Sequence, residues 1–259
     1  MRAIHVPDYS DDPYGTLKKV VPIIGLDPAD AAKTAYGGSF LFHHQELWPE
    51  DFLDRAEADL ESGGEGASLN AITNAKRAIH CQVDTVLAAS GYDPTRLSMR
   101  TKLQKVAALG FVAPRILKRV SDTRNVLEHE YRRPDPDHVA EAVDLATLFV
   151  GMAGQALRSL GGSFSIGNLA DYRQQATGMF SRCLDFNINT YKHSVTLRGT
   201  GIALPGYSGN SWEVDLATIQ VGEPLYDASF RLAIARNRGR QLQLAVADFL
   251  LELESCPDR

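Results

Sequence analysis

An arginine and a histidine at close spacing are the residues of this chain best suited to chemistry. Arg124 is followed five positions later by His129, inside the stretch Asp122–Tyr131. The planar guanidinium of arginine binds phosphate through paired hydrogen bonds, and histidine transfers protons near neutral pH. The pair therefore indicates phosphodiester chemistry that needs no metal ion.

Three further side chains in the same stretch can support this pair. Asn125 comes directly after the arginine and lies one helical turn before His129, where its amide can orient the imidazole ring. Glu128 precedes the histidine, and Tyr131 follows it by two positions, where a phenol can contact substrate. We expect these residues to complete the site.

The order Arg124, Asn125, His129, Tyr131 resembles the motif of the HEPN family. These are small helical domains found in ribonuclease toxins, RNA-processing enzymes and prokaryotic defence systems. The family motif is an arginine, often followed by a polar residue, and a histidine four to six residues on; an extended form adds a tyrosine two positions later. The resemblance covers roughly residues 50–160, and implies a helical bundle that acts as a toxin or in defence against phage.

The resemblance also implies a mechanism and partners. RNA carries its own nucleophile, the 2′-hydroxyl, so His129 would act on that proton while Arg124 stabilises the charged transition state. The product would be a cyclic phosphate, formed without metal or cofactor. In toxin members the residue matching Tyr131 accepts adenylate from a partner nucleotidyltransferase, which makes an antitoxin of that kind a candidate partner. The additional domain of this chain puts that partner in doubt.

Helix geometry adds a requirement for dimerisation. Five residues on a straight α-helix turn through about 500°, so Arg124 and His129 stand about 140° apart. One helix does not present both side chains on one face. A symmetric homodimer, which the resemblance implies, would bring two copies of the motif to one cleft.

Other interpretations of the motif remain open. Arg124, Glu128 and Arg132 also form an i, i+4, i+8 row, which is a common surface ion-pair pattern, and His129 can cap a helix end. The spacing itself is common, since Arg133 and His138 repeat it across two prolines. On this interpretation the bundle is a non-catalytic module that dimerises or binds RNA or nucleotide, and the C-terminal domain carries the function. A metallohydrolase is poorly supported because no His, Asp and Glu residues have ligand spacing.

The charge distribution favours RNA as the partner. The chain carries a net charge of −5, but residues 96–133 contain ten basic and three acidic residues. A basic segment in an otherwise acidic chain is typical of a local phosphate-binding face. We expect Arg119, Arg132 and Arg133 to contact RNA there, unless these side chains lie on separate solvated faces.

The composition predicts an ordinary globular protein. The chain has 259 residues, of which 44% are hydrophobic, and its three cysteines are widely spaced. No apolar run approaches the ~20 residues of a membrane helix, and the N-terminus lacks an apolar segment of signal-peptide length. These features predict a cytoplasmic protein without disulfides, metal sites or membrane contact.

Hydrophobic periodicity divides the chain into three parts. Residues 1–48 are expected to be an irregular lead, with at best an edge strand at Val20–Ile24. Helical periodicity over residues 49–162 predicts an HEPN-like antiparallel bundle. Alternating patterns in residues 178–259, including Phe230–Ile234, predict a small α+β domain with an antiparallel sheet and a last helix from Arg240. The expected fold class is mostly α.

Overall fold

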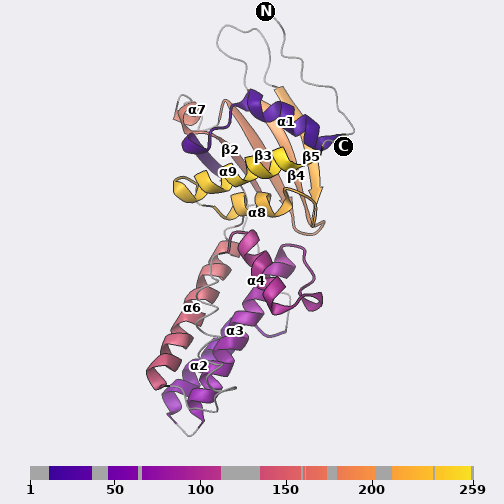
Figure 1. Cartoon of the computed structure of the whole chain (residues 1–259). Helices are drawn as coiled ribbons and strands as arrows, with labels where there is room; N and C mark the ends of the chain where they lie inside the picture. The colour runs from indigo at the N-terminus through magenta and orange to yellow at the C-terminus, as the bar shows by residue number, and fades with distance from the viewer. Residues whose placement is uncertain are drawn as a thin grey trace, which may run out of the picture. The chain divides into compact units, whose positions relative to one another are not determined.

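The computed structural model describes residues 12–36, 46–63, 66–111, 135–158, 160, 162–173, 180–201, 212–235 and 237–257. In this part of the chain, α-helices accompany one antiparallel sheet, which confirms the coarse fold class that the sequence predicts (Figure 1). The chain divides into two compact units. A sheet unit combines Met1–Ser39 with Leu160–Arg259, and a helical unit comprises Phe40–Ser159.

The helical unit is built on a helical hairpin. Its described helices are α2 (Pro49–Ser62), α3 (Ala67–Ala89), α4 (Met99–Ala108) and α6 (Pro136–Arg158). Helices α2 and α3 pack against each other across a short connection, and α6 packs along α3. Small residues such as Ala71, Ala75 and Ala78 are fully buried on α3 and allow the neighbouring helices to approach closely.

Local sequence signals explain where these helices begin. Pro49 occupies the first turn of α2, where its missing N–H would have no helical partner. The Ser98 hydroxyl caps α4 by accepting a hydrogen bond from the Thr101 N–H at 3.2 Å. Helix α4 is also joined to α3 by an ion pair of 2.7 Å between Lys102 Nζ and Asp84 Oδ1, both of them largely buried.

Helix α6 bears on the expectation that the chain lacks a membrane helix. It has 23 residues and a mean hydropathy of 1.2 in its most apolar window, which is long and apolar enough to cross a membrane. Core helices pass the same test, and α6 buries Val139, Val143, Phe149 and Val150 inside the helical unit. Packing within the unit therefore occupies one face of α6, whereas Leu148 and Met152 of the same helix are more than half exposed.

The sheet unit contains a five-stranded sheet in the simple order β1-β2-β3-β4-β5. Its strands are β1 (Ala31–Tyr36), β2 (Ser163–Asn168), β3 (Arg182–Asn189), β4 (Ser194–Gly201) and β5 (Trp212–Gln220). Every neighbouring pair is antiparallel, and Tyr36 pairs with Ser163 at the junction of β1 and β2. The helical unit is therefore inserted between two adjacent strands.

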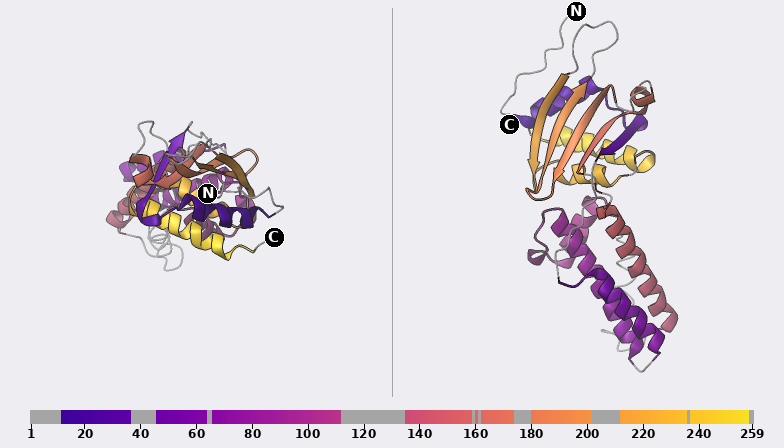
Figure 2. Two further views of the ribbon diagram at one scale, coloured as in Figure 1. Left: turned by 90° about the horizontal axis from the view of Figure 1, so that it is seen from above. Right: turned by 180° about the vertical axis from the view of Figure 1, so that it is seen from behind.

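Helices cover one face of this sheet. They are α1 (Pro13–Ile24), α8 (Tyr226–Ile234) and α9 (Arg240–Ser255), and all three lie on the same side (Figure 1). Under them the Phe164 and Phe186 rings stack at 4.7 Å, and Phe249 of α9 meets Phe186 edge-on at 5.6 Å. In the view from behind, the five strands lie in front of these helices, so the opposite face of the sheet is turned toward the viewer (Figure 2).

The N-terminal part of the chain is not the irregular lead that the sequence predicts. Residues 13–36 form α1 and β1 and belong to the sheet unit, so Val20–Ile24 is helical and not an edge strand. The Asp12 carboxylate caps α1 by accepting from the Gly15 N–H at 2.8 Å, and Gly25 ends the helix with φ 68°. The stabilisation from these two caps offsets the helix-breaking effect of Pro22 inside α1.

Two other expectations about the sheet are also wrong. The α+β region is not confined to residues 178–259, because β1 and β2 supply two of its strands. The alternating residues Phe230, Leu232 and Ile234 lie in α8 and not in a strand. Burial on most sides of α8 makes its helical periodicity hard to recognise, whereas the predicted helix from Arg240 is confirmed as α9.

Candidate functional site

Because its strands alternate, the sheet is polar over much of the face opposite α1, α8 and α9, the face that these three helices leave uncovered. On β3, Leu184 and Phe186 point into the core, while Asp185 and Asn187 point to the opposite face. The strand register extends this pattern sideways. It places Ser165, Asp185, Arg198 and Asp215 next to one another on four successive strands.

The Asp185 carboxylate is held by neutral hydrogen-bond donors. The Ser165 hydroxyl donates to Oδ1, and the Thr200 hydroxyl donates to Oδ2 at 3.0 Å. The Cys183 sulfur lies 3.5 Å from Oδ1 and 2.9 Å from the Thr200 oxygen. Donors from three strands therefore fix the orientation of this half-buried carboxylate.

Arg198 lies directly opposite Asp185 in the register but pairs with the next strand. Its Nε donates to Asp215 Oδ1 at 2.7 Å, and its Nη1 contacts Glu213. Hydrogen bonding and charge from Asp215, followed by the contribution of Glu213, raise the pKa of the guanidinium. These side chains are about half exposed, so the pairs add little stability, but they offset the arginine charge.

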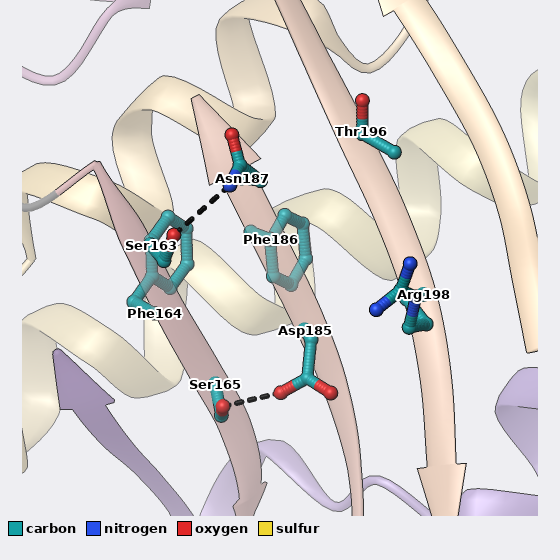
Figure 3. A pocket seen from close by; sticks show the side chains of 8 residues that line it. All are labelled: Ser163, Phe164, Ser165, Asp185, Phe186, Asn187, Thr196 and Arg198. Carbon is teal, nitrogen blue, oxygen red and sulfur yellow. Dashed lines mark hydrogen bonds between the residues drawn. The ribbon is translucent and has the colours of Figure 1, made fainter. Parts of the chain in front are cut away.

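A groove of about 440 Å³ lies along the uncovered face beside Asp185 and Arg198 (Figure 3). Its lining comprises Ser163, Phe164, Ser165, Asp185, Phe186, Asn187, Thr196 and Arg198. The two phenylalanine side chains are almost fully buried in the core on the other side, so they present backbone and not ring faces to the groove. Asn187 Nδ2 donates to Ser163 Oγ at 3.1 Å, which leaves the amide oxygen of Asn187 as an acceptor.

An apolar cluster covers one end of the same face. Phe180 packs with Ala32, Cys183 and Leu169, the last of these from the short helix α7 (Leu169–Arg173). A Cβ at Gly167 would lie 2.7 Å from the Phe180 ring and 2.8 Å from the Arg182 carbonyl oxygen. Phe180 therefore crosses β2 at a position where only glycine leaves enough room.

Covalent and metal chemistry find little support at this face. Burial, opposed in part by the Thr200 hydrogen bond and reinforced by Asp185, raises the pKa of the Cys183 thiol to about 12. The thiol is therefore protonated at neutral pH and is a weak nucleophile. Within the described ranges there is no group of three or more His, Cys, Asp or Glu side chains arranged to hold a metal ion.

A buried lysine lies on the core side of β1. Lys33 is 6% exposed, and its Nζ donates to the carbonyl oxygens of Leu232 at 3.1 Å and Ala233 at 2.7 Å, and to that of Ala235. These carbonyls form the C-terminal end of α8, where a positive charge is favourable. Burial lowers the pKa of Lys33 to about 8.

The site residues predicted from sequence lie outside the described residues. They are Arg119, Arg124, Asn125, Glu128, His129, Tyr131, Arg132 and Arg133, all between residues 112 and 134. The described chain resumes at Asp135, directly before α6, and ends before the gap at Phe111, after α4. The arrangement of the Arg124 and His129 pair stays a prediction.

The polar groove was not predicted as a site, although part of its signal is in the sequence. Alternation along 184–189 predicts that Asp185 and Asn187 share a polar face. The partners of Asp185 could not be identified, because pairing of β2 with β3 brings in Ser165 from outside the expected sheet region.

No family model, no curated protein and no solved structure matches this chain.

Proposed function

We propose that the protein is a metal-independent endoribonuclease of the HEPN type, acting in toxin or phage-defence biology. His129 takes the proton from the 2′-hydroxyl of RNA, and Arg124 stabilises the charge that develops on the phosphate. Asn125 and Glu128 orient these two groups, and Tyr131 contacts the substrate. His129 then gives this proton to the leaving 5′-oxygen, and the product carries a 2′,3′-cyclic phosphate.

The observation that carries this proposal is the combined motif Arg124, Asn125, His129, Tyr131 within the basic segment 96–133. The helical character of the surrounding unit agrees with it. Helix α4 precedes the motif, α6 follows it, and both pack with α3 in one compact unit. Arg119, Arg132 and Arg133 supply the positive charge for binding the RNA backbone.

Dimerisation is part of the proposal. The angular separation of Arg124 and His129 on a helix requires either a distorted helix or a second copy of the motif. A twofold axis through the motif would give one cleft with two arginines and two histidines. A nucleotidyltransferase antitoxin that modifies Tyr131 fits the same site as a regulator.

The test is cleavage of RNA with EDTA present. Wild-type protein is expected to cut RNA and to leave cyclic-phosphate ends, and Arg124→Ala and His129→Ala are expected to lose this activity by a factor of about a hundred or more. The oligomeric state of each variant is measured by light scattering. If both variants are folded dimers without activity, Arg124 and His129 take part in the cleavage reaction.

Two control variants match the substitutions. His138→Ala removes an exposed histidine from α6 that has the same spacing from an arginine, and Arg77→Ala removes an exposed arginine from α3. Both are expected to keep wild-type activity. Equal loss in His138→Ala and His129→Ala, or no cleavage of any RNA by a folded wild-type dimer, would contradict the ribonuclease proposal.

A second candidate function is favoured by the sheet. On this alternative the helical unit is a non-catalytic module for dimerisation or RNA binding, and the sheet unit carries the function. The observation that supports this alternative is the polar groove beside Asp185. A solvated sheet face does not require a concave site or a carboxylate held by hydrogen bonds, and this face has both.

A further inference from the structure

The outer face of α9 carries two exposed leucines. Leu244 is 55% exposed and Leu251 is 64% exposed, and their spacing of seven residues places them about 20° apart around the helix axis. Phe249 lies on the opposite side of the helix, where it is fully buried and meets the Phe186 ring of the sheet. Helix α9 lies in front of the strands in Figure 1, so the two leucines face away from the core.

The same face carries one charge of each sign, at opposite ends. Arg240 is exposed in the first turn of α9 and Glu254 is exposed in the last turn, within about 40° of each other around the axis. Among the described residues, neither side chain takes part in an ion pair. Each charge lies at the end of the helix where the helix dipole disfavours it.

The positions of the leucines match a copy of the same face that runs in the opposite direction. The centre of the face lies between Ala247 and Asp248, and Leu244 and Leu251 are equally far from it, about 5 Å along the axis. A twofold axis at this centre places each Leu244 against the partner's Leu251. The small side chain of Ala247 lies at the crossing, where two packed helices approach most closely.

We propose that α9 pairs with the α9 of a second copy of this chain in an antiparallel, twofold-symmetric dimer. In this dimer each Arg240 lies beside the partner's Glu254, so opposite charges meet at both ends. A parallel arrangement would bring like charges together instead. The proposal concerns a face of the sheet unit and is independent of the ribonuclease proposal, whose dimer forms through the motif in the helical unit.

The size of the face sets the expected affinity. Helix α9 has 16 residues and is about 24 Å long, so its outer face is smaller than the roughly 800 Å² that each partner buries in a standard interface. We therefore expect a reversible dimer with a dissociation constant on the order of 100 μM. The symmetric leucines and the complementary charges favour a second copy over an unrelated helix, for which neither feature is required.

Cross-linking across the twofold axis tests this arrangement in the full-length protein. In Ala247→Cys the new thiol lies beside its copy in the partner, so a short bis-maleimide should join two chains. Cys81, Cys183 and Cys256 are buried and should react slowly. Thr218→Cys, at an exposed position on β5, is the control and should give at least about fivefold less cross-linked dimer, because no complex holds its thiols together.

Substitution of a leucine then tests the apolar contact. Leu244→Glu, combined with Ala247→Cys, is expected to lower the cross-linking yield at least about fivefold, because a carboxylate would face the partner's Leu251. Leu148→Glu is the matched control, since Leu148 of α6 is a leucine of similar exposure, at 59%. It is expected to leave the yield unchanged.

Charge reversal tests the antiparallel register. Arg240→Glu and Glu254→Arg are each expected to lower the yield about threefold or more, because each brings like charges together at both ends of the dimer. The combined variant Arg240→Glu with Glu254→Arg restores opposite charges. Its yield is expected to return to within about twofold of the yield of Ala247→Cys alone.

The same measurements can overturn the proposal. Equal cross-linking of Ala247→Cys and Thr218→Cys would mean that α9 does not pair with itself. Equal losses in Leu244→Glu and Leu148→Glu, or a combined charge reversal no better than the single ones, would rule out the contacts described. RNA cleavage is not measured in these experiments, so failure of one proposal leaves the other standing.

Discussion

Lys33 shows how a single buried charge can hold an element in place. Its ammonium donates to three carbonyl groups at the C-terminal end of α8, from a strand that lies far away in the sequence. The end of a helix leaves carbonyl groups without partners, and Lys33 satisfies them inside the core. We infer that this lysine fixes α8 against β1.

The pH dependence of stability tests this role of Lys33. Burial lowers its pKa in the folded state from 10.5 to about 8. Between these two pH values the unfolded chain binds more protons at this position than the folded chain does. The contribution of Lys33 to the free energy of unfolding should therefore rise with pH across this window, by at most about 1.4 kcal/mol per unit.

Urea unfolding of wild type and Lys33→Met at about pH 7.5 and about pH 9.5 measures this contribution. The free-energy difference between wild type and variant is expected to shift in favour of wild type at the higher pH. The variant also leaves the carbonyls of Leu232 and Ala233 without their donor, so it should be less stable at both pH values. A difference that does not change with pH would mean that Lys33 titrates alike in the two states.

At the scale of elements, β2 and the segment before β3 depend on one glycine. Phe180 packs over β2 at Gly167, where an added Cβ would lie 2.8 Å from the Arg182 carbonyl oxygen. The aromatic ring could shift, but the carbonyl belongs to a paired strand and cannot. Gly167→Ala is therefore expected to lower the free energy of unfolding by about 1–3 kcal/mol.

Gly151→Ala is the matched control for this prediction. Gly151 lies inside α6 with no atom within 4 Å of an added Cβ, so alanine should stabilise the helix by about 0.5–1 kcal/mol. Thermal or urea unfolding of the two variants should give opposite signs. Equal effects would mean that space at Gly167 does not limit the packing of Phe180.

The elements that the sequence could predict are those whose burial follows a regular pattern, either a helical stripe or the alternation seen in β3. Helices α3 and α6 have such stripes, and both were expected. Strand β1 was not, because Ala31–Tyr36 has few typical strand residues and places Lys33 on its core side. It pairs with β2, which follows the whole helical unit in the sequence. No local sequence pattern predicts a pairing between strands so far apart in the chain.

At the scale of the whole molecule, the two candidate sites belong to different units. The basic segment 96–133 with the Arg124 and His129 motif lies within the helical unit, and the groove at Asp185 lies in the sheet unit. The first could be proposed from sequence because its residues are neighbours in the chain. The second depends on strand register, which brings Ser165 and Thr200 to Asp185 from strands on both sides.

This division predicts that the sheet unit folds without the helical unit. Tyr36 and Ser163, which flank the inserted segment, are paired on adjacent antiparallel strands, so these two residues lie about 5 Å apart. A flexible linker of about four residues in place of 40–159 can span that gap, as in a β-hairpin. The core under α1, α8 and α9 is formed by residues that this replacement keeps.

The shortened chain is expected to unfold cooperatively in urea and to give the circular dichroism of a sheet with helices. RNA cleavage should be absent, since the Arg124 and His129 motif has been removed. A chain that fails to fold would mean that the sheet unit needs the helical unit for stability, and that the two units form one cooperative structure.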